Sequence, residues 1–173
     1  MTALNYHEES RGQVPGPAER VFEWLDDPRR LSMHMSRSSW RMGGGRMLTT
    51  LDEGRGQRVG SHIRVSGRVF GITIGLDEVV TDRTPPHRKR RETAGSPRLL
   101  VTGAYRIGFE LTARDGESAL QVFIDYALPE RWPSRWLGRL LGRSYARWCT
   151  SRMVNDAVAA FVATPVPRLD GTT

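Results

Sequence analysis

The sequence has little cysteine and no long apolar run, and each shortage excludes a class of protein. One cysteine, Cys149, among 173 residues excludes an internal disulfide and a cysteine-rich metal site, and is typical of a reducing compartment. No window approaches the roughly 18 uninterrupted apolar residues of a membrane-spanning helix, and residues 1–12 lack the apolar stretch of a signal peptide. We therefore expect a cytoplasmic protein without stable membrane insertion.

Lysine is almost absent. Of the 26 basic residues only Lys89 is lysine, so the other 25 are arginines, spread from Arg11 to Arg168. The formal net charge of +7 would attract nucleic acid or an anionic membrane. Because the arginines are dispersed, they indicate a general preference for arginine more than one binding patch, and we expect no nucleic-acid partner.

The sequence also lacks the motifs of metal and phosphate sites. The four histidines, at positions 7, 34, 62 and 87, have no metal-ligand spacing with Cys149 or with a carboxylate cluster. There is no nucleophile-elbow motif, and the glycines at 43–45 precede a predicted strand rather than a helix. We expect no metal and no cofactor.

Helical signals follow a first strand predicted over residues 4–14. Pro17 suits a first helical turn, and one apolar face follows it at i, i+3, i+4 and i+7: Ala18, Val21, Phe22 and Leu25. Asp27 and Pro28 end this helix and start a short second one that carries Leu31 and Met35. Two short helices are therefore predicted after the first strand.

Residues 43–128 alternate between apolar and polar positions, which predicts strands. The inward sets are Val59, Ser61, Ile63, Val65, Gly67 and Val69; Ile72, Ile74, Leu76 and Val80; Tyr105, Ile107, Phe109 and Leu111; and Leu120, Val122, Ile124, Tyr126 and Leu128. Asp115 and Gly116 predict a hairpin turn between the last two strands. Short connections between such strands favour an antiparallel sheet with one covered face.

A helix of about 30 residues, Ser134 to Ala163, is the segment long enough to cover that face. Projection at 100° per residue predicts a buried arc of Leu137, Leu140, Leu141, Tyr145 and Trp148 and a solvated face of Arg135, Arg139, Arg143 and Arg147. The arginine face also leaves open a membrane-surface role or a nucleic-acid role, and the latter predicts binding that falls steeply with salt. We expect one domain over residues 1–163 and a disordered tail over 164–173.

The order of these elements resembles the helix-grip fold of the START-related SRPBCC superfamily, which includes polyketide cyclase/dehydrase-like and lipid-transfer proteins. The resemblance covers residues 4–163 and rests on PAERVFEWLDDPRRL, VGSHIRVSGRVFG, TPPHRKRRET, YRIGFEL, the strand ending IDYALP, and RWLGRLLGRSYARWC. It implies an α+β fold in which a curved antiparallel β-sheet wraps around a long C-terminal α-helix. It also implies a cavity between them for a hydrophobic small molecule, bordered by Gly138 and Gly142.

Two charged features need a separate interpretation. The basic run at 87–91 is predicted to be a solvated edge strand, where charges discourage pairing with another chain. Glu78 is in phase with the inward positions of its strand, where an unpaired carboxylate is costly. The alternative is that the strand bulges or ends near Asp77 and releases Glu78 to water.

We therefore expect a binding or carrier protein for a hydrophobic or aromatic small molecule, lipid-like or polyketide-like, in a cavity of at least about 300 Å³. The expected ligand-binding residues are Trp40, Glu78, Tyr105, Phe109, Ile124, Tyr126, Leu141, Tyr145 and Trp148. The alternative is a polyketide cyclase or aromatase that uses Glu78 and a tyrosine for proton transfer. The sequence favours the non-enzymatic interpretation because it shows no complete catalytic set; it indicates neither the ligand's identity nor the oligomeric state.

Overall fold

A computed structural model describes residues 3–31, 47–69 and 72–163. The chain forms a strand β1 (Tyr6–Val14), two helices α1 (Ala18–Asp26) and α2 (Pro28–Leu31), six further strands, and a long helix α4 (Ser134–Val162). The further strands are β2 (Met47–Leu51), β3 (His62–Val69), β4 (Ile72–Thr84), β5 (Arg88–Thr93), β6 (Tyr105–Arg114) and β7 (Glu117–Tyr126). Met35 and Trp40, which the sequence analysis singles out, lie outside the described residues, as do residues 164–173 of the expected tail.

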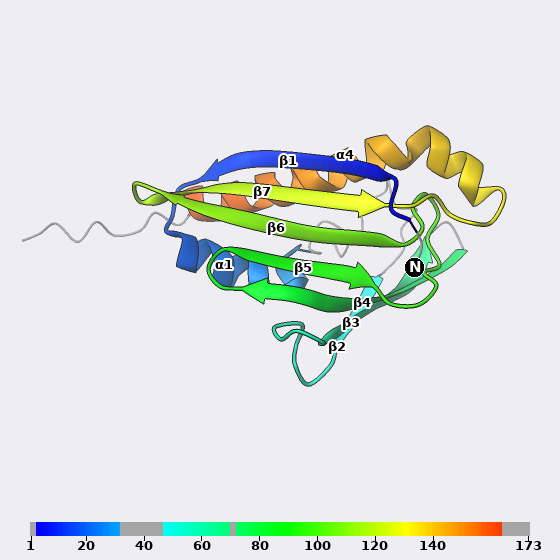
Figure 1. Cartoon of the computed structure of the whole chain (residues 1–173), viewed down its shortest axis with the longest axis horizontal. Helices are drawn as coiled ribbons and strands as arrows, with labels where there is room; N and C mark the ends of the chain where they lie inside the picture. Colours follow the sequence, from blue (N-terminus) through cyan, green and yellow to red (C-terminus); the bar gives the residue numbers. More distant parts are fainter. Residues whose placement is uncertain (1–2, 32–46, 70–71, 164–173) are drawn as a thin grey trace, which may run out of the picture.

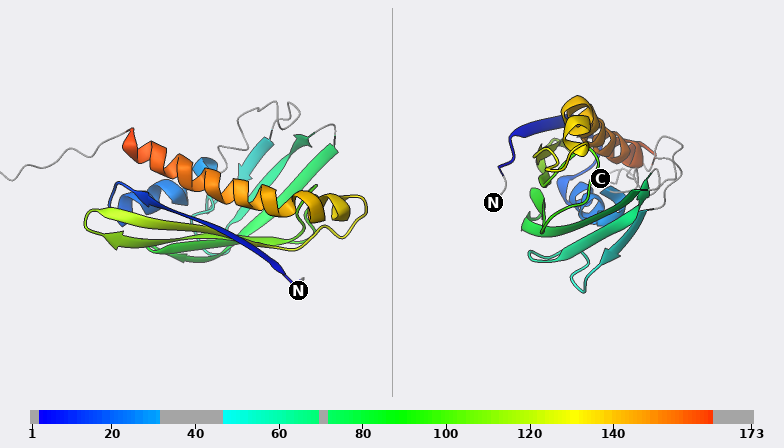
Figure 2. Two further views of the ribbon diagram at one scale, coloured as in Figure 1. Left: turned by 90° about the horizontal axis from the view of Figure 1, so that it is seen from above. Right: turned by 90° about the vertical axis from the view of Figure 1, so that its right-hand side faces the viewer.

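All seven strands form one antiparallel sheet in the order β1-β7-β6-β5-β4-β3-β2. The sheet is curved, and α1 and α4 lie on its concave side (Figures 1 and 2). Helix α4 packs mainly on β1 and β7, while α1 contacts β6, β7 and α4. The predicted α+β helix-grip architecture is therefore confirmed, including the two short helices after the first strand.

Most of the inward positions predicted from alternation are buried. The predicted inward residues of β6, and the four predicted inward residues that fall within β7, form one core cluster with Val21, Phe22 and Leu25 of α1. Asp115 and Gly116 both have positive φ, 39° and 84°, so the predicted hairpin turn between β6 and β7 is confirmed. Two positions were wrong: Val59 precedes β3 and is exposed, and Ile72, at the start of β4, is exposed as well. Strand ends lie at the margin of the sheet, where alternation does not ensure burial.

The face of α4 that meets the sheet differs from the predicted arc. Gly138, Gly142, Ala146, Cys149, Thr150 and Met153 are buried, whereas Leu140, Leu141 and Trp148 are exposed. A Cβ at Gly138 would lie 2.8 Å from the carbonyl oxygen of Val101, and one at Gly142 would lie 3.4 Å from the Tyr126 ring. The glycines therefore permit close contact between helix and sheet and do not border a cavity. The small residues face inward because Tyr126 and the chain around residues 101 and 129 already fill that space.

Among the described residues, no helix is both long enough and apolar enough to cross a membrane. Helix α4 has the length, but exposed arginines recur along its first half.

The close contact at Gly138 predicts an unusual response to alanine. Gly138→Ala should lower the free energy of unfolding by about 1–3 kcal/mol, because the added methyl group meets a backbone oxygen that cannot move cheaply. Gly142→Ala is the matched control. Its methyl group would meet its neighbours at longer distances, and the small cost of these contacts should be offset by a helix-propensity gain of about 1 kcal/mol, so the free energy of unfolding should change little. Urea unfolding measures both, and a Gly138→Ala protein as stable as the wild type would contradict the packing.

Candidate functional site

Strand β5 lies in the middle of the sheet and turns basic side chains toward the interior. It pairs with β4 on one side and β6 on the other, so it is not an edge strand. Lys89 is 1% exposed and Arg91 8% exposed, while Arg88 and Arg90 point outward. The prediction of a solvated edge strand at residues 87–91 was therefore wrong. Side chains alternate along a strand, so a run of consecutive charges in a central strand must place some of them inside.

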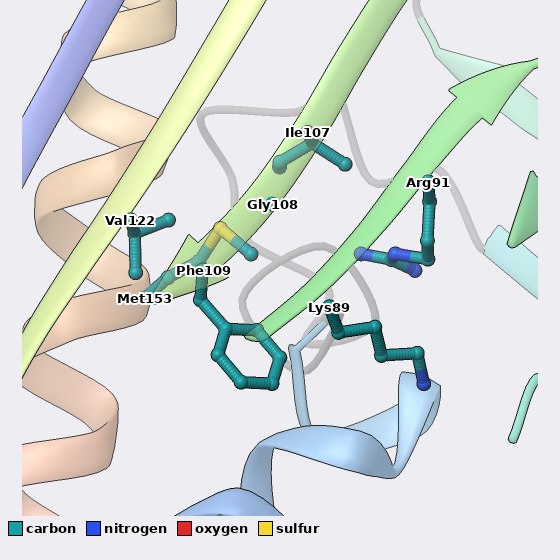
Figure 3. Close-up of a pocket in the computed structure, with 7 residues that line it drawn as sticks. All are labelled: Lys89, Arg91, Ile107, Gly108, Phe109, Val122 and Met153. Carbon is teal, nitrogen blue, oxygen red and sulfur yellow. The ribbon is translucent and has the colours of Figure 1, made fainter. Parts of the chain in front are cut away.

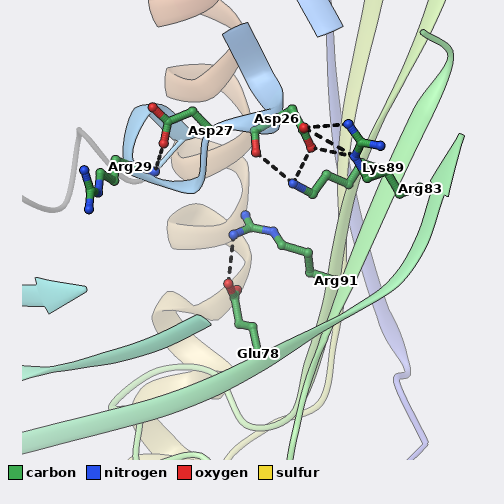
Figure 4. A network of polar contacts seen from close by, with 7 residues as sticks. All are labelled: Asp26, Asp27, Arg29, Glu78, Arg83, Lys89 and Arg91. Atoms are coloured by element: carbon green, nitrogen blue, oxygen red, sulfur yellow. Dashed lines mark hydrogen bonds and ion pairs between the residues drawn. The ribbon is translucent and has the colours of Figure 1, made fainter. Parts of the chain in front are cut away.

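Lys89 is neutralised by the last residue of α1. Its ammonium donates to the Asp26 carboxylate at 2.6 Å and to the Asp26 backbone carbonyl at 2.8 Å (Figure 4). Arg83 of β4 donates to the same carboxylate, with its Nη2 at 2.9 Å. Burial acts to raise the pKa of Asp26, but the hydrogen bonds from Arg83 and Lys89 outweigh it and lower that pKa. Burial lowers the pKa of Lys89 to about 8, although the bond to Asp26 opposes this.

A second buried ion pair joins β4, β5 and β6. Nη1 of Arg91 donates to Oε2 of Glu78 at 2.8 Å, and the hydroxyl of Tyr105 donates to Oε1 of Glu78 at 2.6 Å. Figure 4 shows Glu78 and Arg91 beside the Asp26 cluster. Glu78 is 5% exposed, so the inward orientation is confirmed. The irregularity in β4 falls between Val80 and Asp82, beyond Glu78, and does not release it to water.

Tyr145 of α4 lies close to this group. Burial and the neighbouring Glu78 raise the pKa of Tyr105 well above its ordinary value, and the Tyr145 hydroxyl adds to the effect. Cys149, one turn along α4, raises the pKa of Tyr145, and burial raises the pKa of Cys149 to about 12. The interior therefore holds neutral hydroxyl and thiol groups beside a compensated ion pair.

The expected ligand-binding residues divide into three groups. Glu78, Tyr105 and Tyr145 come together as described. Phe109, Ile124 and Tyr126 are core residues: Phe109 packs edge-on against Phe22 with ring centroids 5.5 Å apart, and Tyr126 stacks on Tyr6 at 5.3 Å. Leu141 and Trp148 are 48% and 42% exposed on α4, and the Trp148 ring lies 6.1 Å from that of Tyr145. Trp40 lies outside the described residues.

Between α4 and β5 to β7 the described residues leave a cavity of about 10 Å³, enough for one water molecule. Lys89, Arg91 and Phe109 line one side of it and Met153 of α4 the other (Figure 3). This volume is far below the roughly 300 Å³ of a small-molecule site, so no ligand fits at this level of the core.

Sequence reasoning missed Asp26, Lys89 and Arg91 as parts of the interior. One signal was available for Lys89, since a basic run flanked by two strands of apolar alternation is compatible with a central position. The partners themselves are not visible in the sequence, because Asp26 is 63 residues from Lys89. Among the described residues no cluster of three or more metal-ligating side chains forms.

Solved structures from several sources share this fold, although no protein-family model and no curated protein sequence matches the chain. Norcoclaurine synthase from Thalictrum flavum, in complex with dopamine and hydroxybenzaldehyde, has a TM-score of 0.63 at 10% identity, over 93% of this chain and 88% of its own. The di-domain ARO/CYC BexL from the BE-7585A biosynthetic pathway gives 0.60 at 14% identity, over 94% of this chain and 51% of its own. Major latex-like protein 151 from Panax ginseng gives 0.54 at 15% identity, over 91% and 98%. Identities this low establish a common fold and leave activity open.

The Asp26 cluster predicts a large loss of stability when its carboxylate is removed. Asp26→Asn leaves Lys89 buried without an anion and should cost about 3–5 kcal/mol in urea unfolding. The control Asp82→Asn breaks a more exposed pair with Arg88 and should cost less than about 1 kcal/mol. Because folding lowers the Asp26 pKa from 3.8, the pair's contribution is present above that pH and declines as acid protonates the carboxylate. Equal costs for the two variants would contradict the cluster's role.

Proposed function

Because the chain has the helix-grip fold of the START-related SRPBCC superfamily, we propose that it binds a hydrophobic or aromatic small molecule between the concave face of the sheet and α4. The observation that carries the proposal is the Glu78–Arg91–Tyr105 group, a buried, hydrogen-bonded polar set next to the apolar core cluster. Small-molecule sites combine apolar walls with a few convergent polar groups that orient the ligand.

Two further observations support this location. Leu141 and Trp148 of α4 remain substantially exposed beside Tyr145, so they offer apolar surface to a ligand. Helix α4 packs chiefly on β1 and β7, so most of its contacts lie on one side of the sheet, away from β3 and β4. Norcoclaurine synthase, which has the same fold, is seen with two aromatic ligands, and this favours an aromatic ligand class here.

We favour binding over catalysis. A cyclase or aromatase, the activity class suggested by the ARO/CYC relative in fold, would use Glu78 and a tyrosine for proton transfer. Efficient acid–base catalysis needs a group whose pKa lies near the working pH. The pKa of Tyr105 is raised well above its ordinary value of 10, which makes this hydroxyl a poor proton donor near neutrality.

Binding is tested with the fluorescent aromatic anion 1-anilinonaphthalene-8-sulfonate. The wild type should show saturable fluorescence enhancement with about one site per chain. Leu141→Arg should weaken the affinity at least about tenfold, because it places a charge in the apolar wall on α4. The matched control Leu48→Arg changes an exposed leucine on β2 and should leave the affinity unchanged. Equal affinities for the two variants, at unchanged melting temperatures, would contradict the proposed location.

Glu78→Gln separates a carrier from an enzyme. Glutamine keeps the side-chain shape but loses one acceptor oxygen and the charge opposite Arg91, so binding is measured well below the variant's own melting temperature. A carrier, whose apolar walls supply most of the affinity, should there keep its probe affinity within about threefold. A cyclase should instead lose turnover of a poly-β-keto thioester by at least about 100-fold, in the range that general acid–base groups contribute. Turnover by the wild type that is lost in this variant would overturn the preference for a carrier.

A further inference from the structure

Helix α4 carries large apolar side chains on the side that faces away from the sheet. Trp132, in the turn before the helix, is 83% exposed, and Trp136 and Leu140 are 59% and 57% exposed. Trp136 and Leu140 are four residues apart on α4 and so lie on one side of the helix, about 40° apart, and Trp132 precedes them in the turn. Leu140 lies two positions, about 200°, from the sheet-facing Gly138 and Gly142. We call Trp132, Trp136 and Leu140 the outer apolar strip.

Arginines flank this strip. Arg131, Arg135, Arg139, Arg143 and Arg147 are all exposed, and residues 131–148 contain no acidic residue. Arg143 donates to Glu8 of β1 at 2.7 Å, whereas no carboxylate among the described residues forms an ion pair with Arg135 or Arg139. In Figure 1 the first turns of α4 extend past the ends of β1 and β7, so the described chain leaves this surface accessible. The molecule thus presents aromatic and cationic groups together at one end.

We propose that the outer apolar strip docks on the surface of an anionic lipid bilayer, with α4 lying parallel to the membrane. Tryptophan prefers the level of the lipid headgroups, where its ring is buried and its N–H remains hydrated. Arginines around such a strip contact lipid phosphates, and each basic residue near an anionic surface strengthens binding roughly fivefold. The helix does not cross the bilayer, since its arginines are far too costly at the centre.

Other occupants fit this surface less well. A second copy of the chain would bring two sets of arginines together without any acidic residue between 131 and 148 to neutralise them. Nucleic acid would bind the arginines and stack on tryptophan, but it offers no apolar contact for the exposed Leu140 at the end of the strip. An anionic bilayer is the partner that satisfies the apolar and the cationic components at once.

Vesicle flotation tests the proposal with the full chain. The wild type should float with phosphatidylcholine vesicles containing about 30% phosphatidylserine and much less with phosphatidylcholine alone. Trp132→Ser/Trp136→Ser should lower the partition coefficient at least about tenfold. Arg135→Glu/Arg139→Glu should lower it at least about 25-fold, because each of the two arginines contributes about fivefold. Matched controls are Leu48→Ser on β2 and Arg68→Glu/Arg114→Glu on β3 and β6, all at exposed positions. Circular dichroism melting confirms that every variant is folded.

Two flotation results would overturn the proposal. One is equal flotation with both lipid mixtures, and the other is an equal loss of flotation in the strip variants and in the control variants. Binding of a duplex DNA probe that depends on Arg135 and Arg139, without vesicle binding, would assign the surface to nucleic acid. Sedimentation that shows a dimer lost in Trp132→Ser/Trp136→Ser, again without vesicle binding, would assign it to self-association. Because the strip lies outside the ligand site, its failure would leave the proposed function standing, and Leu141→Arg tests that function separately.

Discussion

The compensation of inward-facing cations on the central strand is the constraint on which the interior depends. Lys89 and Arg91 point from β5 into the concave side of the sheet, and each needs an anion within hydrogen-bonding distance because a buried unpaired charge costs several kcal/mol. Asp26 at the end of α1 supplies one anion and Glu78 of β4 the other. The ion pair between Asp26 and Lys89 therefore also holds the end of α1 against β5.

This arrangement divides the interior into two parts. Near Phe109 and Met153 the core is closely packed, with room for about one water molecule. Farther along the sheet, the Glu78–Arg91–Tyr105 group and Tyr145 form a polar region bounded by apolar residues. At Gly138 and Gly142 helix α4 lies close against Tyr126 of β7 and the segments around residues 101 and 129, and most of its other contacts with the sheet are on β1 and β7.

Most of the fold was predictable from the sequence, because alternation and helical periodicity report burial directly. The sets in β6 and β7 and the face of α1 are buried as predicted, and Glu78 faces inward. The buried face of α4 was not predictable from hydrophobicity, since glycine and alanine face the sheet while leucines and tryptophans stay outside. The central position of β5 was missed because its charges are neutralised by residues distant in sequence, and a pattern within one strand contains no information about those partners.

The coupling between Glu78 and Arg91 tests the central constraint most directly. A double-mutant cycle with Glu78→Gln, Arg91→Met and both together, followed by urea unfolding, isolates their interaction free energy. The account predicts that each single variant is strongly destabilised and that the double variant recovers at least about 2 kcal/mol relative to additivity, because neither charge is then buried alone. Additive losses would show that the two side chains do not compensate each other and would contradict the account.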